Sequence, residues 1–556
     1  MSSRLIPRSS LIRSPLVSRI TRAAPARLYS TASSGTTKSI RTTAILSVGL
    51  LASAYALYVY ETSSSGESPS VGKSLNDIYG STFDINIRGP RGVQPYQFIR
   101  KSEQEVEKIL KENESGMKLL GRKGNPVIRW DTNWVGSNEP CEDRFASNII
   151  PRNSDKLEEG RKKDLMLFSI IDGHAGDSTS KLLEKTLHPV LSFALAGLQA
   201  GYLPTDNKTS WKSWSENLNP ISWIYSKVGA PWNSDNVIRT IQHAYTELDD
   251  HICQSPIKLL STLKNPSNPS EYPTPRQTLV ALAQPAASGA CAITTFVDAE
   301  NDDLYVALAG DCRAVAGWQS PDGQWRCDTL TEDQMGENPK EVERMQKEHP
   351  ASERDTVIKG GRVQGGLQPT RAFGDAVYKW TTAQGNAIAD AFREESDKPR
   401  GVRPWNLTPP YVTAKPEVTY RKLQNKQGDK LKFVIMATDG LWDRLTSEES
   451  VLLMASYLSH PEHSDIPKTE LPKLYPLSPS IEERPYPAQD LPRPSDSSWA
   501  YENDSNAATH LIRNSLAGAN KKNRAELLSL NGKVSRWMRD DVTCTVIFFD
   551  DPEKNV

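Results

Sequence analysis

The chain has 556 residues, a formal net charge of −1 and a hydrophobic content of 37%. This length suits one large domain with insertions or two to three ordinary domains, and the near-zero charge argues against a nucleic-acid partner. The six cysteines show no CxxC spacing and do not reach the density of a disulfide scaffold, so we interpret them as reduced and mostly structural.

The first 60 residues differ in composition from the rest of the chain. They contain no Asp or Glu, and arginines are scattered among Ser, Thr, Ala and Leu up to Arg41. An acid-free leader rich in Arg and Ser is typical of a mitochondrial presequence, which we predict for residues 1–43. A disordered basic arm is the alternative, whereas a secretory signal is disfavoured because the basic stretch is too long.

Residues 44–60 are uncharged and apolar, between Arg41 and Glu61. With the two preceding threonines they would span about 28 Å as a helix, at the short end of what crosses a hydrocarbon core of about 30 Å. We predict a single transmembrane anchor in the mitochondrial inner membrane, with an apolar part of the presequence as the alternative. The flanking charges keep the N-terminal side in the matrix. The rest of the chain would then face the intermembrane space, or the matrix if the segment passes through.

Residues 61–92 are rich in Ser, Gly and Pro, and we predict a linker there. Ser102 and Glu105 form a capping-box pattern, which predicts the start of a helix. We expect this helix to continue into residues 113–115. Its apolar stripe would consist of Val106, Ile109 and Leu110.

Apolar patterns predict the elements that follow. A buried strand is predicted at 165–174, a helix from 176 to about 200, and a second helix near 237–252. Residues 201–236 have no strand or long-helix period, so we predict an insertion there. Its tryptophans form either a satellite core or a docking surface for a protein substrate. They are Trp211, Trp214, Trp223 and Trp232.

Three successive antiparallel strands are predicted in the middle of the chain, with a turn at Gly310–Asp311 between the second and the third. The three strands cover residues 290–297, 303–309 and 312–318. A charged helix is predicted from 337 to 349, and paired glycines at 360–366 mark a hairpin. A Pro- and Ser-rich stretch within residues 460–505 predicts a second insertion or loop.

Three of the predicted strands place carboxylates at their ends. These are Asp172 within 165–174, Asp439 after 433–438, and Asp540 before 542–549. A single Asp at such a place is usually a turn residue. If the strands are neighbours in one sheet, however, the three carboxylates converge and repel by roughly 4 kcal/mol per pair about 4 Å apart at an effective dielectric near 20. A bound cation removes this repulsion, and all-oxygen ligands favour Mg²⁺ or Mn²⁺ over zinc.

Five short motifs occur in an order that resembles the metal-dependent (type 2C) protein serine/threonine phosphatases. They are Asp172–His174, Gly310–Arg313, Arg371–Asp375, Asp439–Asp443 and Arg539–Asp541. Upstream, Glu142–Asp143 is similar to the acidic pair of the family, and Ser288–Gly289 is similar to its central segment. The resemblance covers residues 93–550. Residues 102–115 and 137–144 are similar to mitochondrial pyruvate dehydrogenase phosphatases.

The resemblance implies an α+β fold, an α/β/β/α sandwich of two antiparallel sheets flanked by helices, with a binuclear metal centre. Two Mg²⁺ or Mn²⁺ ions per site are implied, and a third, weaker ion is held by many members at positions matching Asp311 and Asp443, where a turn Asp is the alternative. The implied metal ligands are Asp172 (bridging), the carbonyl of Gly173, Asp439 and Asp540, with Glu142 and Asp143 holding metal-bound water. Such ions make hydroxide available to attack phosphorus near neutral pH.

His174 resembles the general acid of the family, which protonates the leaving seryl or threonyl oxygen; an inert loop histidine is the alternative. Asn138 stands where many members have a phosphate-binding arginine, and an amide can hydrogen-bond a phosphate but cannot neutralise it. Gln334 stands where the family often has a histidine.

Three classes of function compete. The first is a mitochondrial hydrolase of phosphoserine and phosphothreonine in proteins, with the pyruvate dehydrogenase E1 component as candidate substrate and the membrane as a partner through residues 44–60. The second is a catalytically weak, membrane-anchored binding module, which the intact strand-end carboxylates disfavour. The third is another two-metal phosphoesterase such as a nuclease, disfavoured by the neutral charge.

Overall fold

The structure is a computed structural model in which Tyr79–Val556 forms one compact unit. The predicted presequence, the predicted anchor and most of the predicted linker lie outside the residues that it describes. In the described part of the chain, no helix is long and apolar enough to cross a membrane. The described residues are 81–89, 92–119, 124–151, 163–204, 225–227, 229–262, 273–392, 406–425, 428–459, 464–480 and 497–550.

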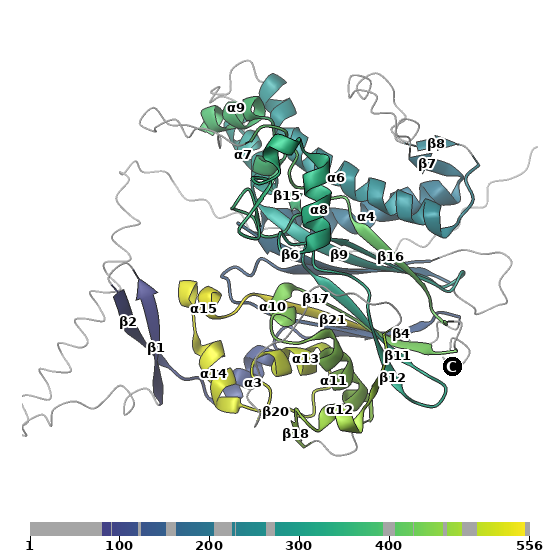
Figure 1. Cartoon of the computed structure of the whole chain (residues 1–556), viewed down its shortest axis with the longest axis vertical. Coiled ribbons are helices and arrows are strands. Elements are labelled where there is room, and N and C mark those ends of the chain that lie inside the picture. The colour runs from purple at the N-terminus through teal and green to yellow at the C-terminus, as the bar shows by residue number, and fades with distance from the viewer. Residues whose placement is uncertain are drawn as a thin grey trace, which may run out of the picture. The chain divides into compact units, whose positions relative to one another are not determined.

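Two large sheets form the centre of this unit (Figure 1). The first is six-stranded and antiparallel, with the order β16-β10-β9-β6-β5 and with β15 pairing on β9. Its strands are β5 (Arg144–Ile150), β6 (Leu165–His174), β9 (Gly289–Asp298), β10 (Asp303–Ala309), β15 (Phe373–Gly374) and β16 (Glu417–Lys422). The predicted buried strand at 165–174 is therefore confirmed as β6, near the middle of this sheet.

The second sheet is seven-stranded, with the order β19-β12-β11-β17-β21-β4-β3. Its pairs are antiparallel except for β12 and β19. Its strands are β3 (Ser115–Lys118), β4 (Val127–Val135), β11 (Arg313–Gln319), β12 (Trp325–Thr329), β17 (Lys430–Ala437), β19 (Leu477–Ser478) and β21 (Val542–Phe549). Because β17 and β21 are direct neighbours, the chain near Asp439 and the chain near Asp540 reach the same end of this sheet.

The two sheets pack face to face through alternating side chains of their strands. In β6, Met166, Phe168 and Ile170 belong to a core shared with residues of β11, β17 and β21. The alternate residues Leu165 and Leu167 belong to a different core, with the helices on the outer face. A strand buried on both faces reads as a continuous apolar run, and burying each such side chain contributes roughly 1.5–3 kcal/mol.

Helices cover the outer face of each sheet. The core of the six-stranded side includes residues of α4 (Ser178–Gln199), α6 (Ser234–Thr262) and α7 (Pro275–Ala287). The core of the seven-stranded side includes residues of α3 (Glu103–Lys111), α11 (Ser447–Ser459), α13 (Ala507–Ser515) and α14 (Lys521–Ser529). Figure 1 shows the resulting helix–sheet–sheet–helix layers. Mixed α+β architecture, as predicted, is confirmed.

Smaller elements complete the described chain. They are α8 (Pro339–Glu348), α9 (Thr382–Phe392), α10 (Asp439–Trp442), α12 (Leu471–Leu474), α15 (Gly532–Met538), η2 (Ala351–Glu353), η3 (Ala376–Tyr378), and the strand pairs β7 (Tyr202–Pro204) with β8 (Tyr225–Lys227), β13 (Ile358–Lys359) with β14 (Arg362–Val363), and β18 (Ile466–Pro467) with β20 (Ser498–Trp499). The predicted charged helix and the glycine-marked hairpin are confirmed as α8 and β13–β14.

The predicted capping box is present at the start of α3. The Ser102 hydroxyl accepts a hydrogen bond from the backbone of Glu105, and the Glu105 side chain accepts one from the backbone of Ser102. The helix ends at Lys111, however, and Ser115 already starts β3. The expected continuation of the helix is wrong because the chain turns after Lys111 and pairs with β4 from Ser115 on.

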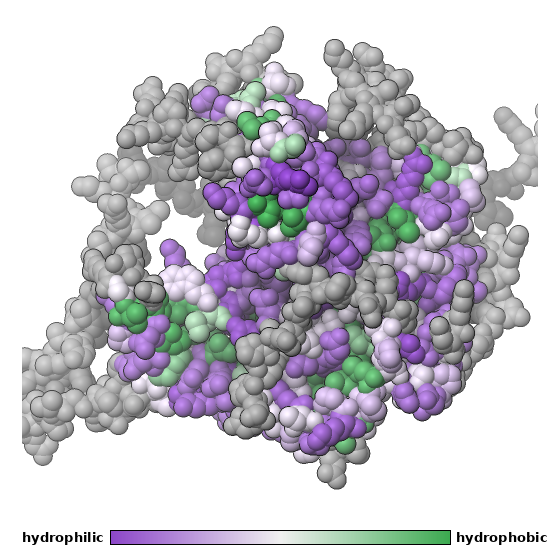
Figure 2. Space-filling view, viewed as in Figure 1, coloured by the Kyte–Doolittle hydropathy of each residue, from purple (hydrophilic) through white to green (hydrophobic). Residues whose placement is uncertain are grey.

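The predicted linker is wrong in its last part. Strands β1 (Thr82–Gly89) and β2 (Gly92–Ile99) form an antiparallel hairpin. Alternating apolar residues in β1 suit a strand, and the rings of Phe83 and Phe98 lie 5.8 Å apart across the pair. Figure 2 shows apolar surface where this hairpin and α15 lie in Figure 1.

The predicted hairpin between residues 303–309 and 312–318 is also wrong. Strand β10 pairs with β9 and β16, whereas β11 pairs with β12 and β17 in the other sheet. The chain crosses between the sheets at Gly310, which has a φ of 124°. A Cβ atom there would lie 2.3 Å from the Cys291 sulfur, so the crossing requires glycine. Sequence alternation does not distinguish a hairpin from such a crossing.

The two predicted insertions are described only in part. Residues 205–224, which include Trp211, Trp214 and Trp223, lie outside the described chain, as do residues 460–463 and 481–496. Residues 202–204 and 225–227 pair as β7–β8, and α6 starts at Ser234, inside the predicted insertion. Trp232 packs against the core on the six-stranded side and donates a hydrogen bond to Asp298 at 2.9 Å.

Candidate active site

Carboxylates from both sheets meet at one end of the sandwich. Asp172 lies on β6 of the six-stranded sheet, whereas Asp439 follows β17 and Asp540 precedes β21 in the other sheet. The condition considered from the sequence, that all three strands are neighbours in one sheet, holds only for β17 and β21. The carboxylates converge from the two sheets instead. Their convergence is seen in the electrostatic interaction of Asp172 with four other acids. We call the set the acidic cluster: Asp143, Asp172, Asp311, Asp439 and Asp540.

Burial and mutual repulsion make the ionised form of this cluster costly. Burial first, and then the neighbouring carboxylates, raise the pKa of Asp172 and that of Asp439 well above the usual range. The same two causes raise the pKa of Asp143. Burial raises that of Asp311 and that of Asp540. Carboxylates in this state gain free energy from any bound cation.

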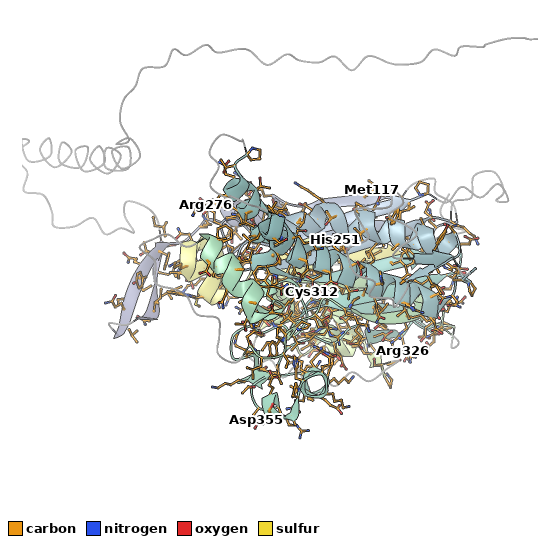
Figure 3. All side chains as sticks on the ribbon, turned by 90° about the horizontal axis from the view of Figure 1, so that it is seen from above. Met117, His251, Arg276, Cys312, Arg326 and Asp355 are labelled. Carbon is orange, nitrogen blue, oxygen red and sulfur yellow. The ribbon has the colours of Figure 1, made fainter. Side chains whose placement is uncertain are left out.

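Within the described ranges, no three or more His, Cys, Asp or Glu side chains come together closely enough to hold a metal ion as they stand. Uncompensated carboxylates repel, so close approach is not expected without a cation. The chemistry of the donors nevertheless fits a hard divalent ion, because the cluster consists of buried carboxylate oxygens. Cys312, labelled in Figure 3, is fully buried beside Asp311, and burial raises the pKa of its thiol well above the usual range, so it offers no thiolate.

Arg536 of α15 contacts the Asp540 carboxylate. Burial lowers the pKa of the guanidinium, but Asp540, Asp439 and Asp172 raise it by a larger amount. A protein cation therefore lies within electrostatic range of three members of the acidic cluster.

The acidic pair Glu142–Asp143 is held against the same end of the sandwich. Asp143 accepts hydrogen bonds from the hydroxyls of Thr543 at 2.7 Å and Thr438 at 3.1 Å. Glu142 accepts one from the Gly176 backbone at 2.6 Å, and burial raises its pKa. The loop that carries the pair is thereby tied to both sheets.

Asp541 organises this loop and was missed as a site residue in the sequence. Its carboxylate accepts hydrogen bonds from the backbone of Ser137 at 2.5 Å, Asn138 at 2.8 Å and Glu142 at 2.8 Å. Burial raises the pKa of Asp541, but these hydrogen bonds outweigh burial and hold the pKa below its usual value. The only sequence signal was its place as the second acid of the Arg539–Asp541 motif.

Asn138 lies between two carboxylates. Its amide nitrogen donates to Glu142 at 3.2 Å and to Asp541 at 3.1 Å. An amide has two N–H groups, so in this arrangement both are used to hold the acidic loop. The predicted contact of Asn138 with substrate phosphate stays a prediction.

His174 has a carboxylate partner that the sequence did not reveal. Its Nε2 atom lies 2.7 Å from Oδ2 of Asp375. Burial lowers the pKa of His174, but Asp375 more than offsets burial and the pKa is raised. A Cβ atom on Gly289 would lie 2.1 Å from both His174 and Asp375, so glycine at this position is required for the pair to form. Asp375 belongs to the Arg371–Asp375 motif, but nothing in the sequence pointed it toward His174.

Asp375 is fixed by a buried support. Its backbone N–H donates to Ser288 at 2.9 Å, and the N–H of the preceding Gly374 donates to Asp249 at 2.9 Å. Asp249 in turn forms an ion pair with Lys379 at 2.6 Å. This chain of contacts orients the carboxylate toward His174.

Gly173, Asp443 and Gln334, which the sequence analysis also singled out, lie near the acidic cluster or the crossing between the sheets. A Cβ atom on Gly173 would lie 2.4 Å from the Glu142 carbonyl oxygen, so glycine lets β6 approach the acidic loop. Partial burial, and then Asp540, raise the pKa of Asp443 at the end of α10. Gln334 accepts a hydrogen bond from the Gly310 backbone at 2.9 Å and so holds the crossing between the sheets.

Comparisons with known proteins show which family the chain is similar to. Residues 257–466 match the model of the family "Protein phosphatase 2C". A protein phosphatase 2C homologue of Schizosaccharomyces pombe is 34% identical, over 76% of this chain and 81% of that protein. The mitochondrial [pyruvate dehydrogenase (acetyl-transferring)]-phosphatase 1 of Saccharomyces cerevisiae is 33% identical, over 83% of this chain and 77% of that protein. The human phosphatase 2 of the same description is 30% identical, over 81% and 84%.

A solved serine-threonine phosphatase 2C of Toxoplasma gondii aligns with a TM-score of 0.38 and 15% identity, covering 79% of this chain and 99% of that chain. This similarity is too low to support an argument. The matches in sequence are high enough to show the family. The chain belongs to the protein phosphatase 2C family. It is therefore a metal-dependent protein serine/threonine phosphatase, as its sequence motifs indicated.

Proposed function

We propose that this phosphatase works in mitochondria and removes phosphate from serine or threonine of the pyruvate dehydrogenase complex, with the E1 component as substrate. Two of its relatives bear the name of that activity in that organelle. The acid-free, Arg- and Ser-rich leader of this chain supports the same location independently.

The acidic cluster is the single observation that carries the proposed chemistry. Asp172, Asp439 and Asp540 would hold two Mg²⁺ or Mn²⁺ ions with the carbonyl of Gly173. Glu142 and Asp143 would hold water bound to these ions, and Asp311 and Asp443 would offer a weaker third site. Bound ions would supply Lewis acidity and make water available as a nucleophile near neutral pH. The repulsion within the cluster, expressed as raised pKa values, supports a cation-binding role.

His174 would protonate the leaving seryl or threonyl oxygen. Because Nε2 faces Asp375, Nδ1 is the atom that would donate the proton. The raised pKa keeps the imidazole protonated to higher pH, as a general acid at neutral pH requires. Asp375 would fix the ring and stabilise its charge.

A single assay tests this reaction. Purified full-length chain would be mixed with a phosphoserine peptide and with phosphorylated pyruvate dehydrogenase E1, in Mg²⁺, Mn²⁺ or EDTA. We expect metal-dependent release of phosphate from both, faster from the E1 protein, and none in EDTA. Turnover that persists in EDTA would contradict the metal centre, and equal rates on E1 and on an unrelated phosphoprotein would contradict the proposed substrate.

The predicted anchor at residues 44–60 adds a proposal about place. The flanking charges favour an inner-membrane attachment with residues 61–556 in the intermembrane space. A catalytic part in that space would be separated from an E1 substrate in the matrix, so this placement and the proposed substrate exclude each other. Protease added to mitochondria with ruptured outer membranes should then digest the catalytic part. Protection until detergent is added would place it in the matrix, where it meets its proposed substrate directly.

A further inference from the structure

Helix α15 places an exposed arginine in contact with the acidic cluster. The helix ends at Met538, two residues before Asp540, and Arg536 on it contacts the Asp540 carboxylate. The side chain of Arg536 is 41% exposed, whereas that of Asp540 is 20% exposed. The guanidinium therefore reaches solvent while it contacts the cluster, so it is accessible to a phosphorylated side chain that approaches Asp540.

Arg536 lies within electrostatic range of several carboxylates of the site. It interacts electrostatically with Asp439 and Asp172 as well as with Asp540, and it offsets part of the rise that burial causes in the pKa of Glu142. These acids come from β6, from the end of β17 and from the acidic loop. A cation that acts on all of them lies close to their point of convergence.

Other arginines near the site are engaged in the fold. Arg144 donates to two backbone carbonyls and to Asp177. Arg313 is buried in a two-bond pair with Asp333 at 2.8 and 2.5 Å. Arg539 is buried and donates to the Gly136 carbonyl at 2.7 Å. Nε and Nη1 of Arg539 have no hydrogen-bond partner in the described part of the chain, but they are buried. The side chains of Arg144 and Arg313 are 18% and 2% exposed, against 41% for Arg536, so Arg536 is the most accessible of the four to an incoming ligand.

The amide of Asn138, the predicted phosphate contact, also has its donors directed at carboxylates. The dianionic phosphate of a substrate beside this much negative charge needs a cationic donor as well as metal ions. A guanidinium has five N–H donors in a fork that matches two phosphate oxygens, and the contact with Asp540 leaves some of them for a ligand.

We propose that Arg536 binds the phosphoryl group of the phosphoserine or phosphothreonine side chain. It would supply the positive charge that Asn138 lacks. This inference rests on the proposed function, since it assigns a further residue to the same site. Arg536 contributes binding of phosphate and takes no part in proton transfer.

The test compares three variants of the full-length protein. Arg536→Gln removes the charge, Arg536→Lys keeps a charge without the fork, and Lys533→Gln removes another exposed cation of α15 as a control. The measurements are KM and kcat on a phosphoserine peptide, inhibition by inorganic phosphate, and Mn²⁺ binding by calorimetry without substrate.

We expect Arg536→Gln to weaken inhibition by phosphate and to raise KM by roughly 10- to 100-fold, the range for a hydrogen bond between charged groups, with kcat changed by less than about threefold. Arg536→Lys should lie between wild type and Arg536→Gln, and Lys533→Gln should stay within about twofold of wild type.

Phosphate inhibition within twofold of wild type in Arg536→Gln overturns the proposal. So does a loss of phosphate affinity matched by an equal loss of Mn²⁺ affinity, because Arg536 would then act only through Asp540. An equal loss of phosphate affinity in Lys533→Gln would show that any positive charge on α15 has this effect, and it would also overturn the proposal. Failure of wild type itself to release phosphate would refute the proposed function, which is a separate outcome.

Discussion

Two groups of buried charges in this protein are built in opposite ways. The acidic cluster brings carboxylates together with one contacting guanidinium, that of Arg536. On the outer side of the seven-stranded sheet, by contrast, α3, α13 and α14 share what we call the arginine network. It consists of Glu107, Glu502, Asp504, Arg513 and Arg524.

In the arginine network each acid has a partner. Arg513 donates to Asp504 at 2.8 and 2.7 Å and also contacts Glu107, and Arg524 donates to Glu502 at 2.8 Å. Burial raises the pKa of Glu107, but hydrogen bonds from Arg513 and Lys111 outweigh it and bring the pKa to about 2. Paired charges serve the fold, whereas the carboxylates of the acidic cluster outnumber their contacting guanidinium and need an external cation. The contrast separates structural from functional ionisable groups.

The largest expected effect is that of Asp172→Asn. Metal-dependent turnover should fall by at least roughly 10³-fold, since bound ions supply several kcal/mol of transition-state stabilisation. Without metal, the variant should melt no lower than wild type, because one repelling charge is gone. Turnover on a phosphopeptide and thermal melting in EDTA are the measurements.

Asp504→Asn in the arginine network is the matched control for Asp172→Asn. It removes the same type of charge from a paired site, so it should lower stability and leave the activity of the folded fraction intact. Activity of Asp172→Asn within tenfold of wild type would contradict the metal assignment.

His174→Asn should reduce turnover of a phosphopeptide by roughly 10²- to 10⁴-fold, the range for a general acid. The loss should be much smaller on p-nitrophenyl phosphate, whose leaving group needs no proton. Asp375→Asn should show the same selectivity with a smaller loss. Equal losses on the two substrates would refute the role in protonating the leaving group.

Arg513→Leu should destabilise the fold by about 3–5 kcal/mol, because it leaves buried carboxylates unpaired. Urea unfolding measures this change. Lys347→Ala breaks an exposed ion pair with Glu343 and should cost less than about 0.5 kcal/mol. If both variants unfold at the same urea concentration, the arginine network does not have the stabilising role assigned to it.

The smallest effect concerns pH. The pKa of Glu107 is about 2 in the folded chain, below its ordinary value of 4.5. Its contribution is therefore present above pH 4.5 and is lost as pH falls toward 2. Because Glu107 is about one-third exposed, we expect only about 1 kcal/mol. Unfolding of Glu107→Gln should depend less on pH between 5 and 3 than that of wild type, and identical pH profiles would show that the pair contributes nothing.

Local patterns predicted much of this fold. The capping box of α3, the apolar run of β6 and the paired glycines of β13–β14 depend on neighbours in sequence, and each is present. Assignment of a strand to a sheet depends on pairing across long distances. For that reason the sequence placed 312–318 beside 303–309, and it did not show that Asp172 faces Asp439 from the opposite sheet.

The site residues also differ in whether sequence neighbours or distant contacts reveal them. Short motifs led to His174 and to the carboxylates, because the immediate sequence neighbours of these residues identify them. Asp541, Asp375 and Arg536 act through contacts with residues distant in sequence or through position on a surface helix. Only the folded chain reveals such partners.

The most direct test of the central claim is a titration of wild type and Asp172→Asn with Mn²⁺, followed by thermal melting and by calorimetry in buffers of different ionisation enthalpy. We expect Mn²⁺ to stabilise wild type by about 2.7 kcal/mol at 100 times its dissociation constant. Protons should be released on binding because the pKa values of Asp172 and Asp439 are raised in the free chain, and Asp172→Asn should show far weaker stabilisation. A melting temperature of wild type that does not respond to Mn²⁺, or that responds equally in the variant, would contradict a metal site built on this cluster.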